Sequence, residues 1–298
     1  MNFTQKLRSG KFVITAEISP PKSPDMSGVL QDAELLKDLV DAVNVTDNQR
    51  AMMRMAPVAL CRKLWEMGIE PVMHVTCRDR NRLALQSDLL AAHAMGISNI
   101  LAMSGDYPTM GDQPGAKPVY DLDSVHLLQL IGKMNKGIDF QDSTIDGPTS
   151  FIAGAVANPG SRPLDVQLIK LNKKVEAGAG FIQTQAVFDV GAFVEFMDAI
   201  KHLKIPVIAG IIPLRSARSA RFMNDKIPGV MISEEIIKRM EFASEPTAEG
   251  LRIAAETIQQ IRPVCQGVHI MPIGGHENTR HLLELCGQVR KWKKRRSP

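Results

Sequence analysis

The chain of 298 residues contains few aromatic side chains, which make up 5% of it. Hydrophobic residues nevertheless account for 44%, so the core must be built from aliphatic side chains and from the 16 methionines. The charged fraction of 23% is ordinary for a soluble globular protein. The length is sufficient for one large barrel or for two small domains.

Cysteine is scarce as well, and no two cysteines form a C-x-x-C pair. The four are Cys61, Cys77, Cys265 and Cys286. This spacing disfavours both a zinc knuckle and an iron–sulfur cluster motif. We expect reduced cytosolic thiols, and therefore a cytoplasmic protein. Any iron–sulfur chemistry would have to come from another chain.

Several other patterns are missing. No stretch approaches the roughly 18 apolar residues of a membrane span, and the N-terminus MNFTQKLRSGK lacks the apolar core of a signal peptide. Without H-x-H or H-x-x-E-H, and with His269 and His276 isolated, we expect no metal site. The absence of G-x-S-x-G disfavours a serine hydrolase.

The formal net charge is +4, and much of the excess lies in the basic C-terminal tail 290–298, RKWKKRRSP. Such a tail can contact nucleic acid, an anionic membrane or an acidic partner; a solvated terminus is the favoured interpretation, and an acidic partner is the next. The rest of the chain does not interleave aromatic and basic residues, so we expect no nucleic-acid partner.

Short apolar segments typical of strands alternate with amphipathic segments typical of helices along the whole chain. We expect strands at 11–18, 41–46, 70–77, 97–105, 151–157, 180–185, 206–212 and 268–273. We expect helices at 26–39, 55–68, 80–95, 121–131, 164–177, 190–201, 216–224, 234–243, 247–261 and 278–289. This order predicts one domain, 1–298, folded as an α/β, (β/α)8 TIM barrel.

A doubly wound open sheet is the alternative fold, but no G-x-G-x-x-G follows the first strand. The polar segment 133–149 is interpreted as a connection that folds over the site, and not as a domain boundary.

Two carboxylates follow predicted strands, at the end where α/β barrels carry out chemistry. Glu17 lies in AEISPPK, where two prolines stiffen the loop. Partial burial would raise its pKa and suit it to act as a general acid; the alternative is a salt bridge at the barrel rim. Asp106 lies in SGDYP, where Ser104 and Gly105 allow a ligand close to the backbone; the alternative is an Asx turn.

Further polar residues lie on or after other strands. His74 either binds a ligand or is a core histidine. Gln183 and Gln185 share one face of their strand by its period of two, and buried amides of this kind suit a pterin or another amide-bearing heterocycle. Asn158 and Arg162 lie in ANPGSRP, a loop suited to a phosphate.

The motifs AEISPPK, NVTDN, HVTC, SGDYP, ANPGSRP, KKVEAGAGFIQTQAVFD and AGIIPL occur in this order between about residues 10 and 273. Together they resemble the methylenetetrahydrofolate reductase family. The resemblance implies a flavin-binding TIM barrel that reduces 5,10-methylenetetrahydrofolate to 5-methyltetrahydrofolate.

The resemblance also implies roles for individual residues. Glu17 matches the general acid that helps open the imidazolidine ring, and Asp106 matches an aspartate close to flavin and pterin. Gln185, with Gln183 beside it, matches a folate-binding glutamine. The implied flavin contacts are Thr46, His74, Ser104, Gly105 and Asp106, with Lys174 near the flavin phosphate and Asn158 and Arg162 in a loop that aligns loosely.

The chain departs from the familiar reductases at three places. Ser104 replaces an arginine, Ala217 replaces an aromatic residue, and the run MPIGGHEN replaces a motif with Asn-Arg. These changes favour electrons from an iron–sulfur partner subunit or another electron-delivering protein, with the basic tail as a docking element, although NAD(P)H stays open. FAD is the expected cofactor, FMN remains open, and we expect an oligomer. The alternative function is a non-redox folate-binding or partner-activating subunit.

Overall fold

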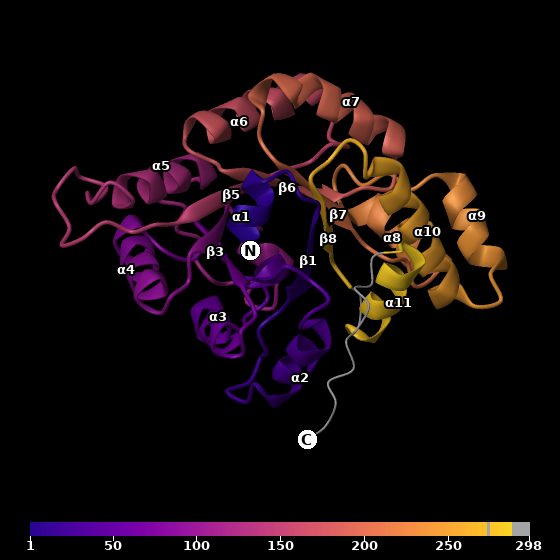
Figure 1. Cartoon of the computed structure of the whole chain (residues 1–298), viewed down its shortest axis with the longest axis horizontal. Coiled ribbons are helices and arrows are strands. Elements are labelled where there is room, and N and C mark those ends of the chain that lie inside the picture. Colours follow the sequence, from indigo (N-terminus) through magenta and orange to yellow (C-terminus); the bar gives the residue numbers. More distant parts are fainter. Residues whose placement is uncertain (273–274, 288–298) are drawn as a thin grey trace.

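The computed structural model describes residues 1–272 and 275–287 and closes eight parallel strands into one barrel (Figure 1). The strands are β1 Val13–Ile18, β2 Ala42–Val45, β3 Pro71–Thr76, β4 Asn99–Met103, β5 Ile152–Ala157, β6 Phe181–Ala186, β7 Val207–Ile211 and β8 Gly267–Ile270. Their order around the barrel follows the sequence, and β8 pairs with β1. The (β/α)8 TIM barrel and its eight predicted strands are confirmed.

Helices surround the barrel, and the predicted ones are present with slightly different ends. They are α2 Ser27–Leu36, α3 Pro57–Glu66, α4 Arg82–Ala94, α5 Ser124–Met134, α6 Leu164–Glu176, α7 Val190–Ile200, α8 Ala217–Lys226, α9 Glu234–Phe242, α10 Pro246–Ile261 and α11 Glu277–Leu285. The described residues also form three short 3-10 helices: η1 Gln49–Ala51 after β2, η2 Pro108–Met110 after β4 and η3 Lys201–Leu203 after α7. The basic tail 290–298 lies outside the described residues.

Local sequence explains where these helices begin and end. The Asn81 side chain accepts a hydrogen bond from Ala84 N at 3.0 Å and so caps the start of α4. Gly96 follows the end of α4 with a φ of 84°, a conformation that glycine adopts without strain. Both ends of this helix are therefore set by single residues.

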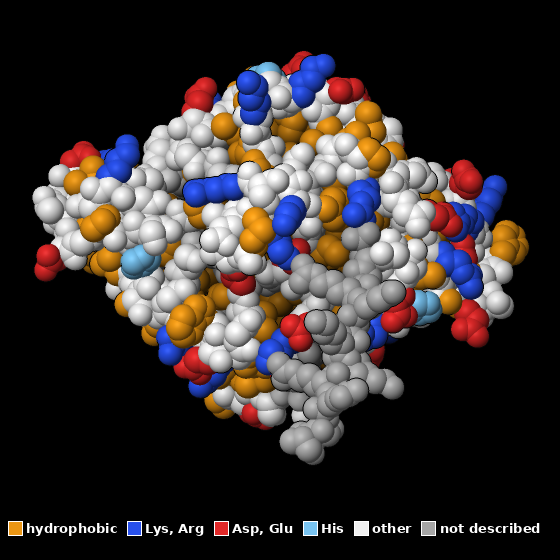
Figure 2. Space-filling view, in the orientation of Figure 1, with side chains coloured by type: hydrophobic (Ala, Val, Ile, Leu, Met, Phe, Trp, Pro, Cys, Tyr) orange, Lys and Arg blue, Asp and Glu red, His pale blue; other side chains and the backbone are white. Residues whose placement is uncertain are grey.

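A helix that the sequence did not predict, α1 Phe3–Arg8, covers the amino ends of the strands (Figure 1). The Phe3 ring packs edge-on against Phe181, with 5.5 Å between ring centroids. Phe3 N donates to Glu70 Oε2 at 2.7 Å. Figure 2 shows the face of the molecule that carries α1, on which basic and acidic side chains are interspersed. Because α1 fills the amino end of the barrel, the opposite end is left for a ligand.

The segment 133–149 does not fold over the site, so that prediction is wrong. Phe140 N donates to Gln86 Oε1 of α4 at 2.8 Å, and the Arg82 guanidinium lies 4.7 Å from the Phe140 ring centroid. The segment links the end of α5 to the start of β5. A helix-to-strand connection of a barrel lies at the end away from the strand carboxyl ends.

Among the described residues, no helix is long and apolar enough to span a bilayer.

Candidate active site

A cavity of about 740 Å³ lies at the carboxyl ends of the strands. Almost all the residues predicted from the sequence line it: Glu17, Thr46, His74, Ser104, Gly105, Asp106, Asn158, Lys174, Gln183 and Gln185. The structure therefore brings together side chains from β1 to β6 that are up to 168 residues apart in the sequence. This is the arrangement expected of a barrel enzyme.

Arg162 was predicted in the same set but does not line the cavity. Its Nη2 donates to Glu195 Oε2 of α7 at 3.0 Å, and its Nη1 donates to Pro159 O at 3.1 Å. Asn158 lines the cavity but uses its Nδ2 to donate to Pro228 O at 2.8 Å. The Arg162 guanidinium is therefore directed toward α7 and away from the cavity.

Glu17 lies at the end of β1 with its side chain 13% exposed. One carboxylate oxygen accepts a hydrogen bond from Gln49 Nε2 at 2.8 Å, and the other lies 3.7 Å from His269 Nε2. Burial raises the pKa of this carboxyl, but His269, His74 and Gln49 together outweigh it, and the pKa is lowered. The raised pKa predicted from the sequence is therefore wrong for the protein by itself.

His74 is buried on β3, and burial lowers its pKa to about 4 although Glu17 opposes the shift. The ring is therefore neutral at pH 7. Asn44 Nδ2 lies 3.0 Å from His74 Nε2, and because an amide nitrogen only donates, Nε2 accepts and Nδ1 carries the proton. Asn44 Nδ2 also donates to Gln183 Oε1 at 2.8 Å. Asn44, which the sequence did not single out, thus orients two predicted site residues.

The predicted pair of glutamines on β6 faces the cavity, as the strand period indicates. Gln183 is 6% exposed and pairs with Asn44. Gln185 Oε1 accepts from Ala186 N at 3.0 Å, where the pairing of β6 with β7 shifts register. The two amides therefore have different surroundings, one fixed in the barrel and one nearer its rim.

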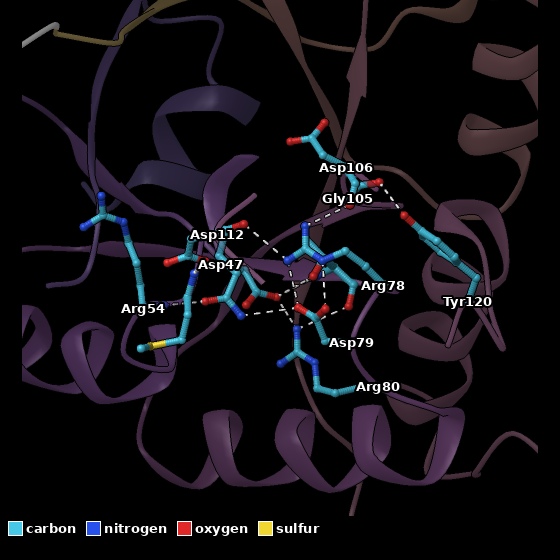
Figure 3. Close-up of polar contacts among 12 residues, drawn as sticks. Asp47, Arg54, Arg78, Asp79, Arg80, Gly105, Asp106, Asp112 and Tyr120 are labelled. Atoms are coloured by element: carbon cyan, nitrogen blue, oxygen red, sulfur yellow. Dashed lines mark hydrogen bonds and ion pairs between the residues drawn. The ribbon is translucent and has the colours of Figure 1, made fainter. Parts of the chain in front are cut away.

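Asp106 is exposed at the cavity mouth, and its backbone is held by two neighbours. Arg78 Nη1 donates to Asp106 O at 3.1 Å, and the Tyr120 hydroxyl donates to Gly105 O at 3.1 Å (Figure 3). Gly105 has a φ of 90°, and a Cβ there would lie 3.1 Å from side-chain carbons of Arg78 and Thr76. Only glycine fits this turn without strain.

Arg78 belongs to an ion-pair network beneath the loops that follow β2, β3 and β4. Its side chain is 2% exposed and donates twice to Asp79, at 2.8 and 2.7 Å. Arg80 pairs with Asp47 (Figure 3), and Asp47 Oδ2 also accepts from Thr76 N at 2.9 Å. Asp47 and Arg78 were not predicted as site residues, although both lie just after strands, as Asp106 does.

One wall of the cavity is cationic. Lys170, Lys173 and Lys174 line it from α6, and Asp123 faces it from the start of α5. Lys174 Nζ donates to Val156 O at 2.7 Å. Burial lowers the pKa of Lys174, and the charge of Lys170 adds to that effect. A phosphate on this wall would relieve the repulsion between the lysines.

Over residues 1–272 and 275–287, no group of three or more His, Cys, Asp or Glu side chains is arranged to hold a metal ion. Cys61, Cys77 and Cys265 are buried free thiols. The polar side chains that line the cavity are carboxylates, amides, hydroxyls, lysines, the His74 imidazole and the Arg78 guanidinium.

A parallel barrel with carboxylates and a cationic wall at its strand carboxyl ends defines the class of TIM-barrel enzymes. The family model described as methylenetetrahydrofolate reductase matches residues 2–287. The chain therefore belongs to the methylenetetrahydrofolate reductase family.

Individual relatives agree with this assignment. The chain is 27% identical over 231 residues to a 5,10-methylenetetrahydrofolate reductase of Pectobacterium carotovorum, covering 74% of this chain and 72% of that protein. It is 30% identical over 210 residues to methylenetetrahydrofolate reductase (NADH) 1 of Arabidopsis thaliana, covering 65% of this chain and 34% of that protein.

Among solved structures, the fold resembles that of a Clostridium thermocellum protein described as binding two copies of 5-methyl-5,6,7,8-tetrahydrofolic acid. The TM-score is 0.66 at 14% sequence identity, and the match covers 96% of this chain and 97% of that one. At this identity the likeness shows the shared barrel fold.

Proposed function

We propose that this protein is an oxidoreductase that reduces 5,10-methylenetetrahydrofolate to 5-methyltetrahydrofolate with a bound flavin. The observation that carries the proposal is the meeting of Glu17, Asp106 and Gln185 in one cavity, in a chain of the methylenetetrahydrofolate reductase family. These are the residues that match the family's acid, its flavin-proximal aspartate and its folate-binding glutamine.

The cavity fits a flavin on two grounds. Its volume of about 740 Å³ lies within the range of roughly 300–1,000 Å³ that cofactor pockets occupy. Its lysine wall, with Lys174 half-buried, offers positive charge to a phosphate. The flavin would supply the hydride, and Thr46, His74, Ser104, Gly105 and Asp106 would hold it. We propose FAD, and chromatography of the extracted cofactor distinguishes FAD from FMN.

The side chains of this protein position the folate and deliver the proton. The amides of Gln183 and Gln185 each offer a donor and an acceptor, which suits the edge of a pterin. Glu17 gives its proton to the folate nitrogen that leaves as the imidazolidine ring opens. A folate in the cavity excludes water from the Glu17 carboxyl, and this further burial raises the pKa toward the value that a proton donor needs.

The electrons, we propose, arrive through a partner protein. Ala217 is the first residue of α8 and does not line the cavity. The described residues that line the cavity include no Phe, Tyr or Trp on which a nicotinamide could stack. An anaerobic visible spectrum tests this. We expect an artificial reductant to bleach the flavin and NADH to leave it oxidised; bleaching by NADH would contradict partner delivery.

The experiment for the main proposal is Glu17→Gln. We expect folate reduction to fall by about 10²–10⁴-fold, the usual contribution of a general acid, while flavin binding is kept. Glu66→Gln is the matched control, because Glu66 lies on the surface of α3 and pairs with Arg62 and Lys63. Undiminished turnover in Glu17→Gln would refute the assignment. Failure of the chain to bind any flavin would favour the non-redox folate role.

A further inference from the structure

Gln49 makes the one direct hydrogen bond to the Glu17 carboxylate among the described residues. Its Nε2 lies 2.8 Å from Glu17 Oε1. The other carboxylate oxygen faces His269, whose Nε2 is buried without a hydrogen-bond partner in the described structure and lies 3.7 Å away, beyond hydrogen-bond reach. The direction of the carboxyl group is therefore set by Gln49.

The amide of Gln49 is itself oriented. The Ser19 hydroxyl donates to Gln49 Oε1 at 3.1 Å, and the Thr46 hydroxyl donates to Ser19 Oγ at 3.0 Å. With its oxygen accepting from Ser19, Gln49 presents its NH2 group to Glu17. A chain of hydrogen bonds thus runs from buried Thr46 to the proposed proton donor.

Gln49 begins the η1 turn, whose backbone is unusual. Asn48, Arg50 and Ala51 have φ angles of 44°, 56° and 55°, in the left-handed region that non-glycine residues seldom adopt. Asn48 is held on two sides, since its Oδ1 accepts from Arg54 N at 2.9 Å and its backbone oxygen accepts from Arg78 Nη2 at 3.2 Å. The turn is therefore fixed by contacts outside itself.

The loop that starts at Asp106 contacts the η1 turn. A Cβ at Gly111 would lie 1.8 Å from Ala51 O, so the two backbones touch there. Asp112 Oδ1 accepts from Met53 N at 2.9 Å, and its other oxygen pairs with Lys22. The loop that carries Asp106 and the turn that carries Gln49 are consequently tied together.

We propose that Gln49 is a positioning residue that fixes the orientation of the ionised Glu17 carboxylate. A folate that enters the cavity displaces the Gln49 amide and so releases Glu17 for protonation. This inference rests on the proposed role of Glu17 as the proton donor. Because Gln49 lines the cavity and is exposed, an entering ligand reaches it directly.

The ionisable groups that face Glu17 come from three elements: His269 of β8, His74 of β3 and His276 before α11. Gln49 is uncharged, so replacing it leaves these three groups in place. A change in the Glu17 pKa on replacing Gln49 therefore reports the lost hydrogen bond.

The test is a titration of the protein without flavin or folate. The Glu17 carboxyl is followed by infrared difference spectroscopy and assigned by its loss in Glu17→Gln. In Gln49→Met, which keeps the length of the side chain and removes the donor, we expect the Glu17 pKa to rise. Gln86→Met on α4 is the matched control, with the Glu17 pKa unchanged. Ser19→Ala, which frees the Gln49 amide, should raise the pKa by less.

An unchanged Glu17 pKa in Gln49→Met would overturn the proposal. A second readout is the alkaline limb of the kcat/KM profile for folate, on which activity falls as Glu17 loses its proton; this limb should move to higher pH in Gln49→Met and not in Gln86→Met. Because the titration needs no turnover, a protein that fails to reduce folate contradicts the proposed function and leaves the role of Gln49 measurable.

Discussion

At the scale of the residue, the environment decides the ionisation of each group in the barrel. Burial makes His74 neutral at pH 7, whereas Glu17 remains ionised although it too is buried, because His269 and Gln49 stabilise its charge. The same residue types on the surface would not differ in this way. The backbone at Gly105 is equally specific, because its φ of 90° and the contacts at 3.1 Å make any side chain there strained.

Gly105→Ala is expected to lower the free energy of unfolding by about 1–3 kcal/mol. The alanine would have to adopt a φ of 90°, and its Cβ would lie 3.1 Å from side-chain carbons of Arg78 and Thr76. Urea unfolding measures the change. Gly115→Ala is the control: a Cβ there has no atom within 4 Å, so its effect should stay within about 0.5 kcal/mol. Equal effects of the two substitutions would contradict this reading of the turn.

The cysteines should react slowly with a thiol reagent at pH 8 in the native protein. Burial raises the pKa of Cys77 to about 12 and the pKa of Cys265 and Cys286 to about 11, and Cys61 is shifted in the same direction. The thiolate is the reactive form, so little of it exists at that pH. All four should react rapidly in denaturant. A rapid native reaction of Cys61 would show that its site opens.

At the scale of the element, the short helix α1 and the loops after the strands have opposite tasks. α1 packs Phe3 into the amino end of the barrel and closes it. The loops after β2, β3 and β4 are joined by Arg78, Arg80 and their carboxylates and leave the other end open. Because α1 closes the amino end of the barrel and the loops form a polar rim at the other end, the cavity lies at the carboxyl ends of the strands.

Phe3→Ala is expected to lower the free energy of unfolding by about 3–5 kcal/mol, because the ring is 1% exposed and leaves a cavity against Phe181. Phe242→Ala is the matched control, since that ring is 86% exposed and its loss should have little effect. Chemical denaturation of both variants checks the difference. A small effect of Phe3→Ala would mean that α1 contributes little to closing the barrel.

At the scale of the whole molecule, stability should depend on pH through His74. Its pKa of about 4 in the folded protein lies below the value of about 6.5 in an unfolded chain. The unfolded chain then binds more protons, so the native state loses stability as the pH falls from about 6.5 to 4. The difference corresponds to roughly 3 kcal/mol. His276, whose pKa burial also lowers, acts in the same direction.

His74→Gln should flatten this dependence, because the amide does not titrate. Urea unfolding of wild type and variant at pH 7.5 and pH 5 measures it, and the loss between the two pH values should be smaller in the variant. Glu17, with its lowered pKa, contributes stability that is lost only at more acidic pH. If His74→Gln loses as much stability between pH 7.5 and pH 5 as the wild type does, the pH dependence comes from His276 or from other groups.

The sequence by itself determined the barrel and most of the cavity. The alternation of short apolar runs with amphipathic segments is a local pattern, and it identified all eight strands. A polar residue among the last residues of a strand, or just after it, lies at the carboxyl end of a parallel barrel, which is why Glu17 and Gln185, near the ends of β1 and β6, and Asp106, after β4, were found. Shared motifs identified the family in the same way.

Only the tertiary structure decided which of these residues touch and how they ionise. His269 is isolated in the sequence but faces Glu17 across neighbouring strands, and its Nδ1 lies 2.9 Å from Thr15 Oγ1. Arg162, expected at the cavity, turns to Glu195, and Glu17 has a lowered pKa where a raised one was expected. Hydrogen bonds and charge interactions depend on distances between strands remote in sequence, and local patterns carry no such distances.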